Sequence, residues 1–179
     1  MKSSFWSDAS RYGAIIGVVE ISFMLLERVI AGSGFLSMLV MIAHLAAYIW
    51  LIVLFTKRRA LLSGDEGFGY GKSLSYILAM GLFAGVIVGG YEIIARNLLF
   101  TEFYNRVVVE QLNIMRGIVA QNPAMGSMSD LKQLVEKTTF SPLWIVFGSI
   151  FSMFIKSLFF GLIVSFVTRK EEQIFEENE

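Results

Sequence analysis

Among the ionisable side chains within the apolar segments of this 179-residue chain, five are candidates for chemistry: Glu20, His44, Glu92, Arg96 and Lys156. Histidine exchanges protons near neutral pH. An isolated charge deep in a bilayer costs about 2.5 to 3.5 kcal/mol, so these groups should face inward and pair. We expect Glu20 to pair with Lys156, with His44 beside them. Glu92 should pair with Arg96 one helical turn later, in the favourable acid-first order.

Two interpretations of these residues remain open. At about 1.5 Å per helical residue, Glu20, His44, Glu92 and Lys156 fall at similar depths and can meet in one polar layer. As a functional site, this intramembrane polar cluster would relay protons or ions, or bind a polar substrate group. As a structural network, it would fix the register of the helices, with Arg96 extending outward. Four short helices leave little room for a water-filled path without oligomerisation, which favours the structural interpretation.

Familiar catalytic and nucleotide-binding motifs do not fit the chain. It has no cysteine and one histidine, and no nucleophile, base and orienting group occur at a recognisable spacing. Gly71, Lys72 and Ser73 resemble the end of a phosphate-binding loop, but Glu66 occupies the position of the required first glycine. We therefore predict no enzyme activity, no catalytic residue and no nucleotide binding.

Other ligand classes are not expected either. Met38, Met41 and His44 recur every third residue, but side chains at this spacing drift around a helix, and methionine often fills apolar gaps. The net charge of zero and the lack of an aromatic motif argue against nucleic-acid binding. We predict no metal and no cofactor.

Four long apolar segments must position these side chains: residues 12–30, 35–55, 74–99 and 142–167. Each is long enough to cross a bilayer as a helix, which takes roughly 20 residues. Hydrophobic residues make up 55% of the chain, and the runs are continuous rather than alternating, which excludes strands. The sequence therefore predicts a single all-α domain, a four-helix bundle in the lipid bilayer.

The distribution of positive residues predicts the orientation. Eight lysines and arginines lie in the flanks that should be on one side of the membrane: Lys2, Arg11, Lys57, Arg58, Arg59, Lys72, Arg169 and Lys170. The short turn on the other side has only Arg28. Positive residues favour the cytoplasmic side. We expect a multi-pass membrane protein with both termini in the cytoplasm.

Small residues at four-residue spacing predict close helix contacts, because backbones in a membrane approach one another where side chains are small. The candidates resemble a glycine zipper: Gly13, Gly17, Gly81, Gly85, Gly89, Gly148 and Ser152. The pattern around Gly13, Gly17 and Glu20 recurs around Gly85, Gly89 and Glu92. This repeat indicates two helical hairpins, and leaves tandem duplication and chance equally open.

Two segments lie outside the predicted spans. Residues 101–141 should form an outer loop containing an amphipathic helix continuous with the third span, followed by a short helix that Ser127 and Asp130 begin with a capping box. These helices either lie on the outer leaflet or recognise a partner. Residues 169–179 form an acidic, solvated cytoplasmic tail.

Three stretches, "RYGAIIG", "FTKRRALLSGDEGFGYGKSLSYILAMG" and "GLIVSFVTRKEE", resemble an uncharacterised bacterial membrane family, domain of unknown function 4199. The resemblance implies a four-helix inner-membrane protein of envelope-bearing bacteria with a long outer loop before the last helix. It implies no activity. We expect an accessory or scaffold protein that binds another membrane or envelope protein. The alternative is a small oligomeric transporter or channel that uses the polar cluster.

Overall fold

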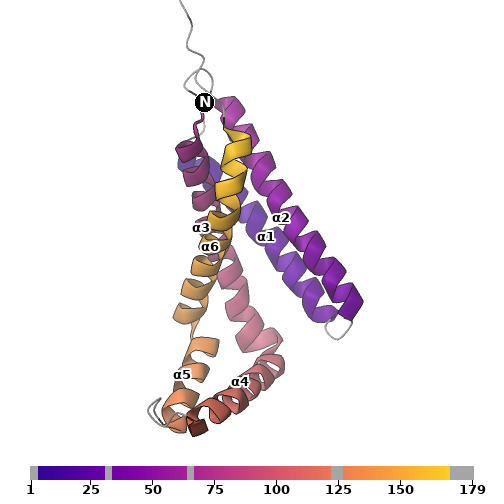
Figure 1. Cartoon of the computed structure of the whole chain (residues 1–179), viewed down its shortest axis with the longest axis vertical. Coiled ribbons are helices and arrows are strands. Elements are labelled where there is room, and N and C mark those ends of the chain that lie inside the picture. The colour runs from indigo at the N-terminus through magenta and orange to yellow at the C-terminus, as the bar shows by residue number, and fades with distance from the viewer. Residues whose placement is uncertain (1–3, 31–33, 64–66, 122–126, 170–179) are drawn as a thin grey trace, which may run out of the picture. The chain divides into compact units, whose positions relative to one another are not determined.

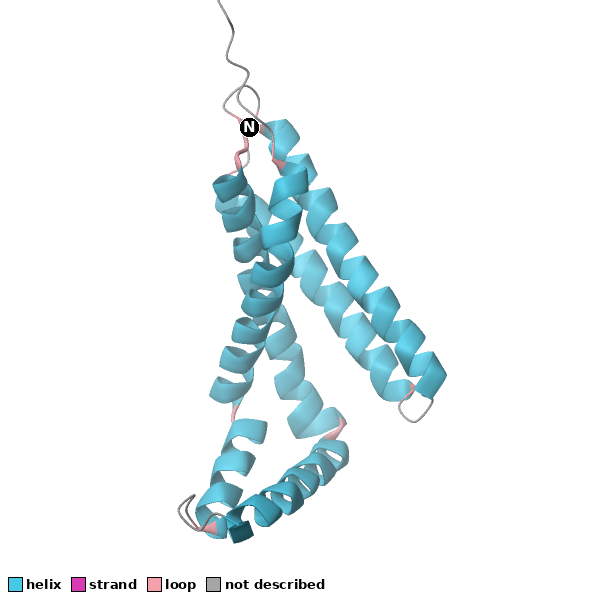
Figure 2. Ribbon diagram, in the orientation of Figure 1, coloured by secondary structure: helices cyan, strands magenta, loops and turns pink. Residues whose placement is uncertain are grey.

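The structure, a computed structural model, describes residues 4–30, 34–63, 67–121 and 127–169 (Figures 1 and 2). Its elements are helical, and four of them are long and apolar enough to cross a membrane. These are α1 (Phe5–Val29), α2 (Gly34–Leu62), the segment Tyr70–Leu99 and α6 (Pro142–Thr168). The predicted all-α membrane fold with four spanning helices is confirmed. The acidic tail, apart from Arg169, lies outside the described residues.

Large apolar side chains cover the outward faces of these helices, as contact with lipid requires. Exposed examples occur on all four and include Val18, Phe35, Leu39, Trp50, Leu82, Val86, Phe151 and Phe159. In water such surfaces would aggregate. The exposed faces therefore fit a bilayer as the surrounding solvent.

The first helix begins seven residues before the predicted span. Ser4 caps it, because its Oγ accepts a hydrogen bond from the Ser7 backbone N–H at 3.2 Å. The added turns contain Asp8, whose carboxylate lies 2.7 Å from an Arg59 guanidinium nitrogen near the end of α2. This ion pair joins the ends of α1 and α2 that lie away from the connecting turn.

The third span ends in an irregular turn that the sequence did not predict. Helix α3 (Tyr70–Ile94) continues as a π-helix, η2 (Ala95–Leu99), and Phe100 interrupts the helical backbone before α4 (Thr101–Gln121). The expectation of one continuous helix through this region is therefore wrong. The predicted second helix is α5 (Met128–Phe140), and Ser127 does cap it, accepting a hydrogen bond from the Asp130 backbone N–H at 3.2 Å.

The chain divides into two compact units, which are described separately. Unit 1 comprises Met1–Val88 and Ile150–Glu179, and unit 2 comprises Gly89–Ser149. In unit 1, α1 and α2 form a hairpin (Figure 1). Its largest fully buried side chains are Ile16, Tyr48, Ile52, Tyr76, Ile77 and Met80.

Glycines bring the helices of unit 1 into close contact. A Cβ added at Gly13 would lie 2.5 Å from the Met80 carbonyl oxygen, and one at Gly17 would lie 2.8 Å from the Ile87 Cβ, so α1 packs directly against α3. A Cβ at Gly81 would overlap the Ser157 hydroxyl of α6. These three glycines occupy positions that admit no side chain without a helix shift.

The remaining predicted packing positions give a mixed result. A Cβ at Gly89 would lie 3.0 Å from the Val146 Cα, and Gly85 is buried. Gly148, in contrast, has nothing within 4 Å of an added Cβ, and Ser152 is exposed. These two residues make no close helix contact within the described chain, where Ser157 and Gly161 of α6 meet α3 instead, so their packing role stays a prediction.

Candidate functional site

A cluster of ionisable side chains lies between α1, α2 and α6 in unit 1. The Glu20 carboxylate of α1 accepts a hydrogen bond from the Lys156 ammonium of α6 at 2.7 Å. Its other oxygen lies 2.9 Å from Nε2 of His44 on α2. The structure thus brings together three of the five candidate residues, from three helices.

A fourth member, Glu27, was missed by the sequence analysis. Its Oε1 lies 3.0 Å from Nδ1 of His44, so the imidazole bridges two carboxylates. Glu27 follows Glu20 by seven residues, two helical turns, which places both carboxylates on one face of α1. This spacing was the available signal, but Glu27 stands beside Arg28 near the predicted membrane boundary and is not among the five candidates.

Aromatic side chains enclose the cluster. The Phe23 ring, from the α1 turn between the two glutamates, stacks on His44 with centroids 4.9 Å apart and planes 6° from parallel. The Lys156 ammonium lies 4.2 Å from the centroid of Tyr48, a cation–π distance. The Tyr48 hydroxyl in turn shares a 2.8 Å hydrogen bond with Ser157, the residue that contacts Gly81. The close helix contact and the ion cluster therefore support each other.

Burial increases along the line of contacts. The side chain of Glu27 is 40% exposed, that of His44 16% and that of Glu20 8%. Such a line of titratable groups can accept, hold and release a proton.

The described residues contain no group of three or more His, Asp or Glu side chains arranged to hold a metal ion.

A separate buried ion pair lies in unit 2. Glu92 is buried and accepts hydrogen bonds from Nε of Arg96 at 2.7 Å and from the Tyr104 hydroxyl at 3.0 Å. The Arg96 guanidinium also lies 5.1 Å from the centroid of the Tyr104 ring. Glu92 and Arg96 thus meet each other. Whether they share one membrane layer with the Glu20 cluster stays a prediction.

The π-helix directs two donors toward the end of α5. Arg96 donates to the Thr139 carbonyl at 3.3 Å, and the Asn97 amide donates to the Phe140 carbonyl at 3.4 Å. The last carbonyls of a helix have no partner within that helix. These contacts join η2 to the end of α5, just before α6 begins at Pro142. Arg96 and Asn97 therefore have a structural role here.

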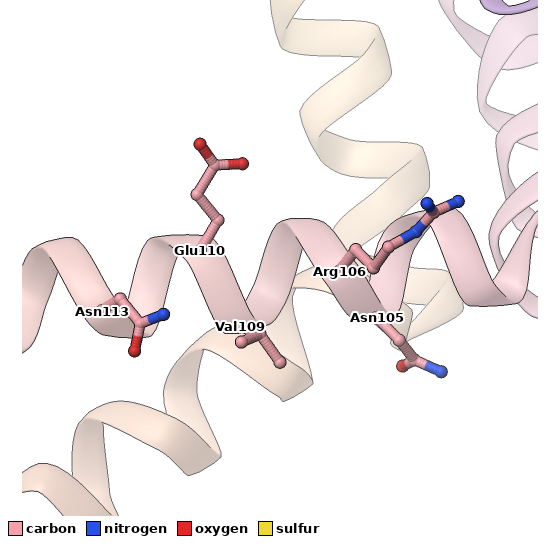
Figure 3. Close-up of a pocket in the computed structure, with 5 residues that line it drawn as sticks. All are labelled: Asn105, Arg106, Val109, Glu110 and Asn113. Atoms are coloured by element: carbon pink, nitrogen blue, oxygen red, sulfur yellow. The ribbon is translucent and has the colours of Figure 1, made fainter.

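Two surface hollows lie on α4 and α5. One, of about 330 Å³, follows α4 alone and is lined by Asn105, Arg106, Val109, Glu110 and Asn113. Figure 3 shows that Glu110 projects away from Asn105 and Asn113, so the side chains do not converge on a common point. The other is a groove of about 420 Å³ between the helices, the α4–α5 groove, lined by Gln111, Ile114, Met115, Leu134, Val135 and Thr138.

Comparison with known proteins gives one family. The family model described as "Protein of unknown function (DUF4199)" matches residues 11–170. No curated protein matches the chain, and no solved structure matches it.

Proposed function

The chain belongs to the DUF4199 family of unknown function, so its role must be inferred from its own geometry, and we propose that it is an accessory or scaffold protein of the bacterial inner membrane. It binds another membrane or envelope protein through α4 and α5. Both termini lie in the cytoplasm, which the lysines and arginines at one set of helix ends support.

The α4–α5 groove is the observation that carries this proposal. It lies outside the spans, yet Ile114 and Leu134 on its walls are 61% and 55% exposed. A groove of this kind suits an amphipathic partner helix, which buries apolar side chains spaced three or four residues apart. Polar lining residues such as Gln111 and Thr138 would fix the orientation of that helix.

The glycine contacts narrow the choice of surface. Gly13, Gly17 and Gly81 are already occupied by helices of the same unit, so they cannot also receive a partner helix. The groove has no such internal occupant among the described residues. It is therefore better placed to receive a partner than these glycine faces.

Co-purification from native membranes in mild detergent tests the proposal. Leu134→Glu should abolish recovery of a stoichiometric partner, because it places a charge on an apolar contact. Val109→Glu is the matched control, because Val109 is 57% exposed on α4 but does not line the groove. Equal recovery with both variants, or no stoichiometric partner of the unmodified protein, would contradict the proposal.

Transport is the second candidate function, and the line of contacts from Glu27 through His44 to Glu20 favours it. In this case the protein would act as a homo-oligomer, since four helices alone leave little room for a solute path. The contacts among Glu27, His44 and Glu20 form a proton route that extends only part of the way into unit 1. They support proton binding more directly than passage of a solute across the membrane.

A further inference from the structure

We propose that Glu27, His44 and Glu20 form a binding site for one exchangeable proton, which enters through Glu27. The site lies in unit 1, whereas the proposed partner groove lies in unit 2. The inference therefore goes beyond the accessory function and does not depend on it.

The hydrogen bonds of His44 define the site. Nδ1 lies 3.0 Å from a Glu27 oxygen and Nε2 lies 2.9 Å from a Glu20 oxygen. An ionised carboxylate only accepts hydrogen bonds, and a neutral imidazole has a single N–H. Both contacts can be hydrogen bonds only if this trio holds one proton more than two carboxylates and a neutral ring provide.

The charges around the ring set how firmly that proton is held. Glu20 and Glu27 face His44 from α1, and the Lys156 ammonium faces it from α6 at 3.5 Å from Nε2. With the proton bound, two acids are balanced by two cations, which suits apolar surroundings. Lys156 nevertheless repels the charged ring, and its own hydrogen bond goes to the Glu20 oxygen that His44 does not contact, so this bond does not need the proton. The proton is therefore held and can also be released.

The position of Glu27 defines the entry step. Glu27 lies two residues before the end of α1 at Val29, and it is the most exposed of the three side chains, whereas Glu20 is the most buried. In the unloaded site, the neutral ring donates Nε2–H to Glu20. A proton taken up on Oε1 of Glu27 then passes to Nδ1, where a new N–H bond forms as the O–H bond breaks. Glu27 is left ionised, and the imidazolium lies between two carboxylates.

The single histidine of the chain makes the proton directly observable. Labelling with ¹⁵N-histidine in lipid nanodiscs gives one pair of ring signals, recorded from about pH 5 to pH 9, the range in which histidine ordinarily changes charge. We expect two N–H groups at the acidic end and a single one-proton transition to one N–H group. Two N–H groups throughout would mean a fixed ion network, and one throughout would mean that no proton binds; either result would overturn the proposal.

The entry role of Glu27 has its own test. Glu27→Gln removes the carboxylate that carries the proton, so exchange of the ring N–H with solvent should slow by about 10²-fold, the usual lower contribution of a positioned acid or base. Glu110→Gln, an acid on α4 far along the sequence from this site, is the control and should leave exchange unchanged. Unchanged exchange in a folded Glu27→Gln protein would refute entry through Glu27. If that variant does not fold, the titration of the unmodified protein still decides whether the site exists.

Discussion

Replacing Gly81 with alanine tests the close contact between α3 and α6. The added Cβ would overlap the Ser157 hydroxyl, lie 2.7 Å from the Ser157 Cβ and lie 3.2 Å from the Met153 carbonyl oxygen. A Cβ is fixed to the backbone and cannot rotate away. Rotation of Ser157 relieves the overlap with its hydroxyl, but the 2.7 Å approach of the two Cβ atoms is relieved only when the helices move apart.

Both responses lower the free energy of unfolding. Overpacking of a close contact costs about 1 to 3 kcal/mol. Rotation of Ser157 also breaks its 2.8 Å hydrogen bond with Tyr48, a net loss of about 1 kcal/mol. Alanine gains up to about 1 kcal/mol over glycine in helix propensity, which offsets part of this cost. We expect Gly81→Ala to destabilise the protein by about 1 to 3 kcal/mol.

Gly148→Ala provides the matched control. Gly148 is also a glycine inside a spanning helix, but an added Cβ there meets nothing within 4 Å. This variant should be neutral or more stable by up to about 1 kcal/mol. Reversible unfolding in mixed micelles, followed by circular dichroism, measures both variants against the unmodified protein.

A second substitution decides whether the contact with Ser157 is the cause. In the double variant Gly81→Ala with Ser157→Gly, the overlap is removed, and the methyl group should then be tolerated better than in the protein with Ser157. Similar unfolding free energies for Gly81→Ala and Gly148→Ala would refute the close packing of α3 on α6. An equal loss of unfolding free energy on Gly81→Ala, whether residue 157 is serine or glycine, would also refute this close packing.

Three further substitutions address separate contacts. Tyr48→Phe should lower the free energy of unfolding by about 1 kcal/mol, because it removes the hydrogen bond to Ser157. The ring beside the Lys156 ammonium is kept. An unchanged free energy of unfolding would argue against the hydrogen bond. Arg59→Met removes the 2.7 Å ion pair with Asp8 and should lower the free energy of unfolding in detergent by about 1 to 3 kcal/mol, whereas Arg59→Lys should retain part of the contact. Ser127→Ala removes the cap of α5 at a cost of about 1 kcal/mol, which should appear as faster amide hydrogen exchange confined to α5. Faster exchange throughout the chain would contradict this local role.

Much of the ion cluster could be predicted from the sequence. The high cost of a charge in lipid requires that Glu20, His44 and Lys156 face inward, and acid–base complementarity indicates which of them pair. The structure shows these contacts at 2.7 and 2.9 Å. Glu27 could have been included, since its spacing of seven residues from Glu20 is visible in the sequence.

The packing register of α6 could not be predicted in the same way. Gly148, Ser152, Ser157 and Gly161 are all small, and composition does not show which face meets α3. That choice depends on where Gly81 lies relative to α6, which is a tertiary property. The π-helix after Ile94 likewise has no local signal, because the contacts that accompany it come from carbonyls at the end of α5, about 40 residues later in the chain.

The most direct test of the central claim, that partnered charges inside the membrane hold these helices together, is a double-mutant cycle on Glu20 and Lys156. Glu20→Gln and Lys156→Met should each destabilise the protein, because each leaves a buried charge without its 2.7 Å partner. The double variant should recover part of the loss, giving a coupling free energy of about 1.5 to 3 kcal/mol. Strictly additive effects of the two substitutions would contradict the account.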